Sequence, residues 1–135
     1  MLTGLVHLHN LLRWVILVLL VWTIINSFLN KNGKETKFLT IVSHTMLLLG
    51  LIQWFIGKWG LKLIQNVGMA EVMKDADRRL MAVEHPITMI ISIVLITIGG
   101  MSVKKGKSNA KWMYILALVL ILSRIPWNRA LFPGM

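Results

Sequence analysis

Four apolar segments, each close to the length that crosses a lipid bilayer, constrain this chain more than any other feature. Their approximate bounds are Leu5–Leu29, Phe38–Gly57, Leu80–Met101 and Trp112–Phe132. A transmembrane helix needs about 20 predominantly apolar residues, and it satisfies its backbone hydrogen bonds internally. The sequence therefore predicts an all-α fold: a four-transmembrane-helix bundle with up-down-up-down connections, forming one integral membrane domain over residues 1–135.

The overall composition favours a membrane protein and argues against other classes. Of the 135 residues, 56% are hydrophobic, while fifteen Lys and Arg against five Asp and Glu give a net charge of +10. A protein that binds nucleic acid rarely combines such a charge with so few polar residues, so we expect membrane lipid and no nucleic acid as partners. The absence of cysteine excludes disulfides, thiol catalysis and iron–sulfur ligation.

The links between the segments predict how the chain is oriented. The short links at residues 30–37 and 102–111 carry seven lysines, whereas the longer link at 58–79 holds five basic and three acidic residues. Basic residues in short loops stay on the cytoplasmic side, so we expect a bacterial inner (cytoplasmic) membrane with both termini on its outer side. The longer link mixes apolar with charged residues, which predicts an amphipathic helix lying at the interface. The first segment lacks the basic start of a signal peptide, so we expect a mature helix.

Ionisable residues within a membrane span are costly, so they usually face the bundle interior or a site. Those in or beside the predicted spans are His9, Arg13, His44, Glu84, His85 and Arg124. Because the first and third helices run in the same direction, His9 and His85, each about one turn inside its span, share one depth. Arg13 and Arg124 lie slightly deeper on that side. His44 enters from the opposite face, at a height about 15 Å from His85.

Two interpretations of this cluster follow from the spacing. Two neutral imidazoles facing each other across a bundle can hold a heme iron axially. The cations available for the heme propionates are Arg13, Arg79, Arg124 and Arg129. Alternatively, His9 and Arg13 pair with Glu84, the only acidic residue predicted within a span, in a network that fixes helix packing. A proton or quinone site is a third interpretation, and spacing alone leaves all three open.

The sequence gives weaker evidence for a binding role of the other two histidines, His44 and His7. His44 has no second histidine at its depth, so a packing role competes with a role in binding a separate ligand. His7 is two residues from His9 and must point to a different side of the helix.

Short motifs in each predicted helix add a family resemblance. They are HNLLRW at 9–14, SH at 43–44 before LGL at 49–51, VEH at 83–85 before ITIG at 96–99, and IPW at 125–127. In their order and spacing, which cover nearly the whole chain, they resemble a family of small bacterial four-helix integral membrane proteins labelled cytochrome b-like. The resemblance implies a b-type heme (heme b), electron transfer, and heme-binding roles for His9, His44 and His85.

With this resemblance included, the leading prediction is a b-type heme protein that relays electrons to or from quinol or a larger respiratory partner. His9 and His85 are the predicted metal ligands, and His44, Arg13 and Arg124 are further candidates for cofactor binding. The sequence lacks flavin and nicotinamide fingerprints, which favours a relay or subunit over a self-contained enzyme. The alternative is a non-catalytic structural or assembly subunit with a buried His/Arg/Glu network. A transporter is disfavoured by the chain's small size, and homo-oligomerisation stays open.

Overall fold

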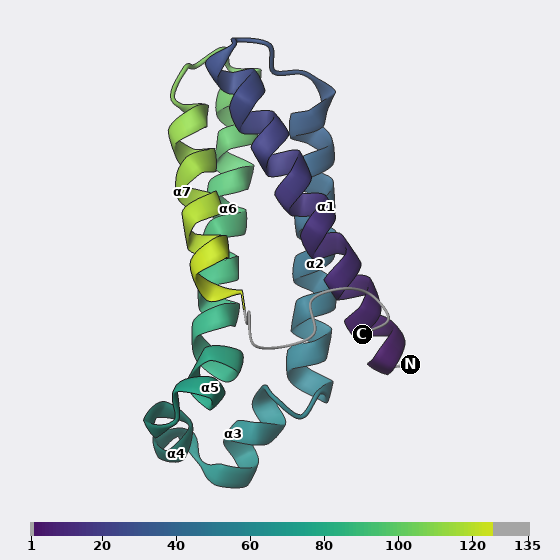
Figure 1. Ribbon diagram of the computed structural model, residues 1–135, viewed down its shortest axis with the longest axis vertical. Coiled ribbons are helices and arrows are strands. Elements are labelled where there is room, and N and C mark those ends of the chain that lie inside the picture. The colour runs from purple at the N-terminus through teal and green to yellow at the C-terminus, as the bar shows by residue number, and fades with distance from the viewer. Residues whose placement is uncertain (1, 126–135) are drawn as a thin grey trace.

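A computed structural model describes residues 2–125, and within this range every regular element is a helix (Figure 1). The four long helices are α1 (Leu2–Phe28), α2 (Lys34–Ile56), α6 (His85–Lys104) and α7 (Ala110–Arg124). Between α2 and α6 lie the short helices α3 (Leu61–Val67), α4 (Met69–Lys74) and α5 (Ala76–Arg79), followed by the π-helical turn η1 (Leu80–Glu84). The predicted all-α class is therefore confirmed.

Three helical stretches are long and apolar enough to cross a membrane: Gly4–Phe28, Lys34–Val67 and Ala76–Lys104. Their outward side chains are largely apolar, and Val18 and Leu48 expose 65% and 60% of their surface. Such surfaces suit a hydrocarbon surrounding and indicate a membrane protein. The fourth predicted span, Trp112–Phe132, lies partly outside the described residues, and its described part belongs to α7.

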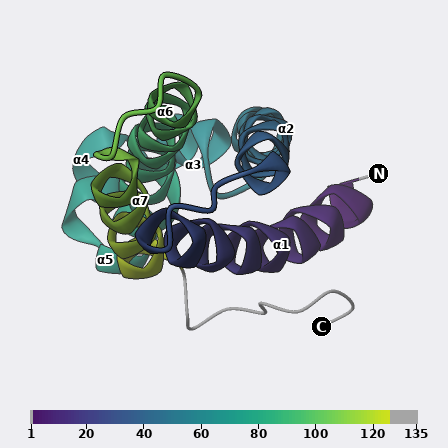
Figure 2. The ribbon, with the colours of Figure 1, turned by 90° about the horizontal axis from the view of Figure 1, so that it is seen from above.

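The long helices pack in a ring in which α1 contacts α2 and α7, and α6 contacts the same two helices. This arrangement places α1 and α6 at diagonal corners, and the view from above shows α1 strongly inclined to the others (Figure 2). Each long helix contributes a large, fully buried side chain to the core, and these are Leu20, Leu39, Ile96 and Tyr114. Two short loops join α1 to α2 and α6 to α7 at the same end.

The link between α2 and α6 differs from the single amphipathic helix that the sequence predicts. Gly68 has a φ of 86°, a left-handed conformation that ends α3 before α4 begins. Asp75 is extended, and its side chain accepts a hydrogen bond from the backbone N–H of Asp77, which caps α5. From Ala76 the chain is helical through to Lys104, so the third membrane stretch begins four residues before its predicted start at Leu80.

The close approach of α6 and α7 depends on the absence of a side chain at Gly99. The Tyr114 ring is fully buried and lies over this glycine. A Cβ atom built on Gly99 would lie 2.9 Å from the ring atoms Cε1 and Cζ of Tyr114. Small residues let membrane helices pack backbone against side chain in this way.

We therefore expect Gly99→Ala to lower the free energy of unfolding by about 1–3 kcal/mol, because the added methyl group overpacks a contact with a rigid ring. Unfolding in detergent micelles, followed by circular dichroism, measures the effect. Gly4→Ala is the matched control, since no heavy atom lies within 4 Å of the Cβ position there. Equal stabilities of the two variants would contradict the packing role of Gly99.

Candidate functional site

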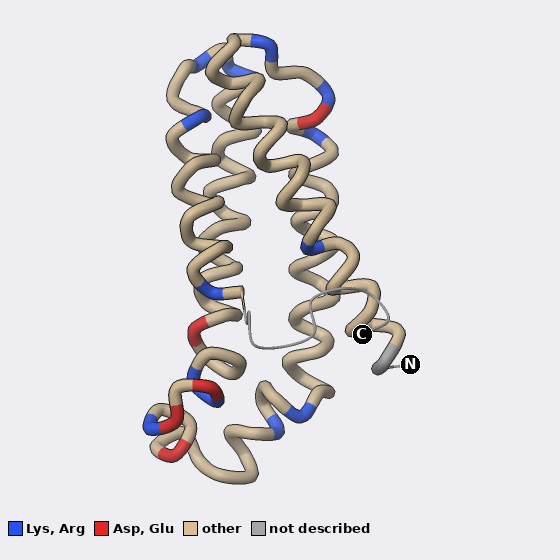
Figure 3. The backbone as a smooth tube through the Cα atoms, viewed as in Figure 1, with Lys and Arg blue, Asp and Glu red and all other residues tan. Residues whose placement is uncertain are grey.

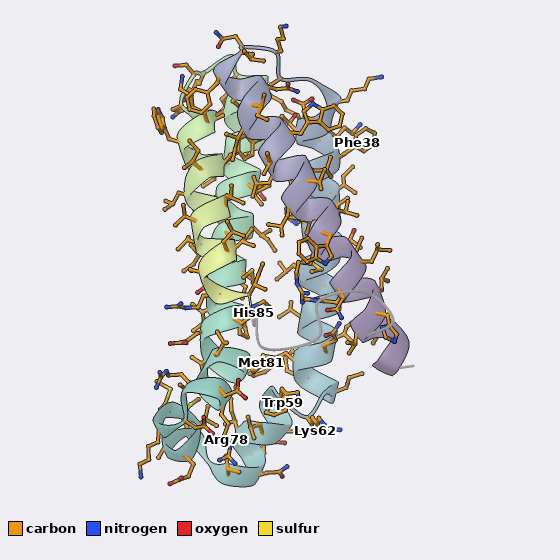
Figure 4. All side chains as sticks on the ribbon, viewed as in Figure 1. Phe38, Trp59, Lys62, Arg78, Met81 and His85 are labelled. Atoms are coloured by element: carbon orange, nitrogen blue, oxygen red, sulfur yellow. The ribbon has the colours of Figure 1, made fainter. Side chains whose placement is uncertain are left out.

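His9 of α1 and His85 at the start of α6 lie beside each other in the bundle. Their ring centroids are 6.3 Å apart, and the ring planes are inclined by 55°. The structure thus brings together the two residues that share a predicted depth. Both are partly buried, and they come from the two diagonal helices of the ring. His85 lies at the lower end of the long helices, above Met81 and the short helices (Figure 4).

The hydrogen bond of His85 determines which of its nitrogens is available. Nδ1 lies 2.9 Å from the backbone carbonyl oxygen of Arg124. A carbonyl only accepts, so Nδ1 carries the proton and donates it, and in the neutral ring Nε2 bears the free lone pair. A metal-binding histidine commonly donates its other ring N–H to a backbone carbonyl, which orients the ring.

Pro86 and Trp54 shape the turn that carries His85. Proline has no N–H, and in a regular α-helix this N–H would bond to the carbonyl of Ala82. In its place, Nε1–H of Trp54 from α2 donates to the Ala82 carbonyl at 2.9 Å. The preceding turn is π-helical, with the N–H of His85 bonded to the Leu80 carbonyl. A side chain of α2 thus completes the backbone hydrogen bonding next to His85.

His9 is placed by the contact between α1 and α2. Its Nε2 atom lies against Gly50, where an added Cβ would be 3.6 Å away. One turn earlier, Nε2–H of Gln53 donates to the Leu5 carbonyl of α1 at 3.0 Å. The small residue and the amide together hold α2 close to the turn that carries His9.

Arg13 follows His9 by one helical turn and is a buried cation. It exposes 7% of its surface, and its Nη2 donates to Oδ1 of Asn10 at 3.1 Å. Asn10 itself exposes 5%. Sequence reasoning did not single out Asn10, although its spacing of three residues from Arg13 is the signal for a contact on one helix face. A charge kept in a membrane interior marks a functional position more often than a structural one.

The remaining predicted candidates do not join this pair through their side chains. His44 is exposed on α2, and its Nε2 lies 2.9 Å from Oγ1 of Thr97, about three helical turns along α6 from His85. Arg124 contributes its backbone carbonyl, while its Nη1 donates to the carbonyl of Ser123.

The ion pair of Glu84 differs from the network that the sequence suggests. Its Oε2 atom lies 3.2 Å from Nε of Arg79, and among residues 2–125 this is its only ion pair. Glu84 therefore does not neutralise His9 or Arg13 as that network requires. His7 is partly buried on α1, and Arg129 lies outside the described residues.

His9 and His85 are the residues that would hold a heme iron. Two imidazole nitrogens bound to one metal at about 2.0–2.1 Å each leave the ring centroids about 6 Å apart, close to the observed spacing. Within residues 2–125 no group of three or more His, Asp or Glu side chains is arranged to hold a metal ion. A heme needs only one or two ligands from the protein, because the porphyrin supplies the others.

No protein-family model matches the chain, and no curated protein or solved structure matches it either. The resemblance to cytochrome b-like proteins therefore stays a prediction. The geometry of His9, His85 and their neighbours is the basis for assigning a function.

The bond from Trp54 predicts a specific double-mutant result. Trp54→Phe leaves the Ala82 carbonyl unpaired and should lower the free energy of unfolding by about 1–3 kcal/mol. In a Pro86→Ala background residue 86 regains an N–H, so the same substitution should cost less. Unfolding in detergent measures all four proteins of the cycle, with Trp22→Phe on the exposed face of α1 as the control. Additive effects of the two substitutions would contradict this compensation.

Proposed function

We propose that this protein is a membrane-embedded b-type heme protein that relays electrons, in which His9 and His85 would hold the iron. The observation that carries the proposal is the 6.3 Å spacing of the two rings, together with the free lone pair on Nε2 of His85. A bound heme supplies an iron centre that takes up and releases one electron.

The residues around the pair have separate tasks in this proposal. The carbonyl of Arg124 orients His85, and the bond from Trp54 to Ala82 holds the turn that carries it. Arg13, buried one turn from His9, is a cation suited to the negative charge of the propionates. The Arg124 guanidinium is a second such cation.

The chain is proposed to be an electron relay because its sequence shows no features of thiol chemistry or of a second redox cofactor. It has no cysteine, and its sequence lacks the glycine-rich fingerprints of flavin and nicotinamide binding. Electrons would then come from, or go to, a quinol or a larger respiratory partner.

We also propose that the four long helices form an up-down-up-down bundle in a bacterial inner membrane, with α7 as the fourth span. Seven lysines and one acidic residue, Glu35, lie at the end that holds the α1–α2 and α6–α7 loops, while the link with the short helices carries five basic and three acidic residues (Figure 3). The positive-inside rule places the lysine-rich end in the cytoplasm and both termini on the outer side. The apolar outer surfaces would contact lipid.

One observation favours the alternative, a structural or assembly subunit. The bonds from His85 to Arg124 and from Gln53 to Leu5 tie neighbouring helices together without any cofactor. In that case the buried polar residues would fix helix packing, and the basic loops would contact lipid or a partner.

The visible spectrum of the purified protein separates the two functions. Protein from heme-replete cells should show a Soret band and, after reduction with dithionite, a sharpened alpha band. His9→Ala and His85→Ala should each abolish the low-spin spectrum, because either change removes one of the two axial nitrogens.

The matched controls are His7→Ala on the same helix as His9, and His44→Ala, which removes an exposed histidine of α2. Both should retain the spectrum. A colourless preparation that is well folded by circular dichroism would exclude the heme proposal. Loss of colour in His44→Ala alone would overturn the assignment of the axial pair.

A further inference from the structure

A histidine lies on a largely apolar outer face. His44 is exposed ten residues after Lys34, the first residue of α2, which places it about 15 Å along the helix. The apolar part of this helix begins at Phe38, after Lys34 and Lys37, so His44 lies about 9 Å inside the hydrocarbon core. Of the exposed residues near it, Ile41 and Leu48 on α2 and Val94 on α6 are apolar, while Thr45 is polar.

The hydrogen bonds around His44 determine where its proton lies. The hydroxyl of Thr97 has a single proton, which it donates to the carbonyl of Ile93 at 2.8 Å. The Thr97 oxygen therefore accepts, and Nε2–H of His44 is the donor across the 2.9 Å contact. In the neutral ring the lone pair is then on Nδ1, which has no hydrogen-bond partner among residues 2–125.

A hydrogen-bond acceptor without a donor is unfavourable in hydrocarbon, because water is absent there and lipid tails have no hydrogen-bond donors. The donor that satisfies it must come from outside the described residues. A donor that does not belong to the chain must also dissolve in the hydrocarbon core, which lipid headgroups do not reach.

A second copy of the chain does not supply this donor through the same face. A two-fold contact places the same surface patch on both sides of the interface. The Thr45 hydroxyl already donates to the Ile41 carbonyl at 3.0 Å, and the Thr97 proton is committed as well. Nε2–H of His44 is equally committed, and the unpartnered hydroxyl of Ser43 is fully buried, so the exposed described polar groups around His44 hold no free proton.

We propose that Nδ1 of His44 is a binding point for the hydroxyl group of a membrane-dissolved hydroquinone. A quinol combines O–H donors with an apolar ring and tail, which suits a lone acceptor among exposed aliphatic side chains. The oxidised quinone carries only acceptors and makes no such bond, so the site prefers the reduced form. The physiological role of this contact, delivery of electrons, rests on the proposed function, whereas the contact itself needs no heme.

Binding of decylubiquinol and of decylubiquinone to the whole protein in lipid nanodiscs tests the proposal. Labelling the histidines with ¹⁵N lets NMR follow Nδ1 of His44 directly. The quinol should shift this resonance, and it should bind about fivefold more tightly than the quinone, the effect of one hydrogen bond. His44→Phe should reduce the preference to about one.

Thr45→Val is the matched control, because it alters the adjacent exposed residue but removes a hydroxyl whose proton is already committed. It should retain the preference for quinol. Equal binding of the two redox forms by the unaltered protein would refute the proposal, as would a preference that persists in His44→Phe. Dimerisation that depends on His44 in the absence of quinol would also refute it, since a second copy would then satisfy Nδ1.

The outcome is independent of the heme proposal. A colourless protein that prefers quinol would exclude the heme proposal and support the quinol site. A heme-loaded protein that binds quinol and quinone equally would support the heme proposal and exclude the quinol site.

Discussion

Side-chain N–H groups that donate to backbone carbonyls join all four long helices at the histidine end of the molecule. Gln53 joins α2 to α1, Trp54 joins α2 to the turn that leads into α6, and His85 joins α6 to α7. In a membrane the hydrophobic effect does not drive helices together, and each such bond contributes about 0.6–2 kcal/mol. The relative positions of the histidines therefore depend on these three bonds.

Two of the three acceptor carbonyls are available because the helices leave them unused. Pro86 has no N–H to give to Ala82, and Arg124 is the last residue of α7, where carbonyls lack partners within the helix. Each open carbonyl takes a ring N–H from a neighbouring helix. The break in the backbone and the orientation of His85 are thus two aspects of one local arrangement.

Helix geometry explains why part of this arrangement is predictable from sequence. The positions of the apolar segments imply parallel first and third helices, and the rise per residue then places His9 and His85 at one depth. The structure brings these rings together. The bond of Trp54 was not predictable in this way, because tryptophans near span ends usually belong to an interfacial belt. Its recognition requires knowing which carbonyl Pro86 leaves open and which helix lies opposite.

The partner of Glu84 shows the same limit. Depth alone allows it to pair with His9 or Arg13, yet it pairs with Arg79, five residues before it. The intervening turn is π-helical, and a π turn changes the direction in which side chains leave the helix. Sequence periodicity assumes 3.6 residues per turn and so places Glu84 on a different face. The broken link at Gly68 is a similar case, since an amphipathic pattern does not reveal a left-handed glycine.

The contrast between His85 and His44 argues for different chemistry at the two positions. His85 commits Nδ1 to its own fold and leaves Nε2, the nitrogen farther from the backbone, free for the proposed ligand. His44 commits Nε2 to Thr97 and keeps Nδ1, which lies close to its own helix. A ligand that binds Nδ1 of His44 would therefore lie against the outer face of α2. For His44 to bind iron through Nε2, it would first have to give up the bond that joins α2 to α6.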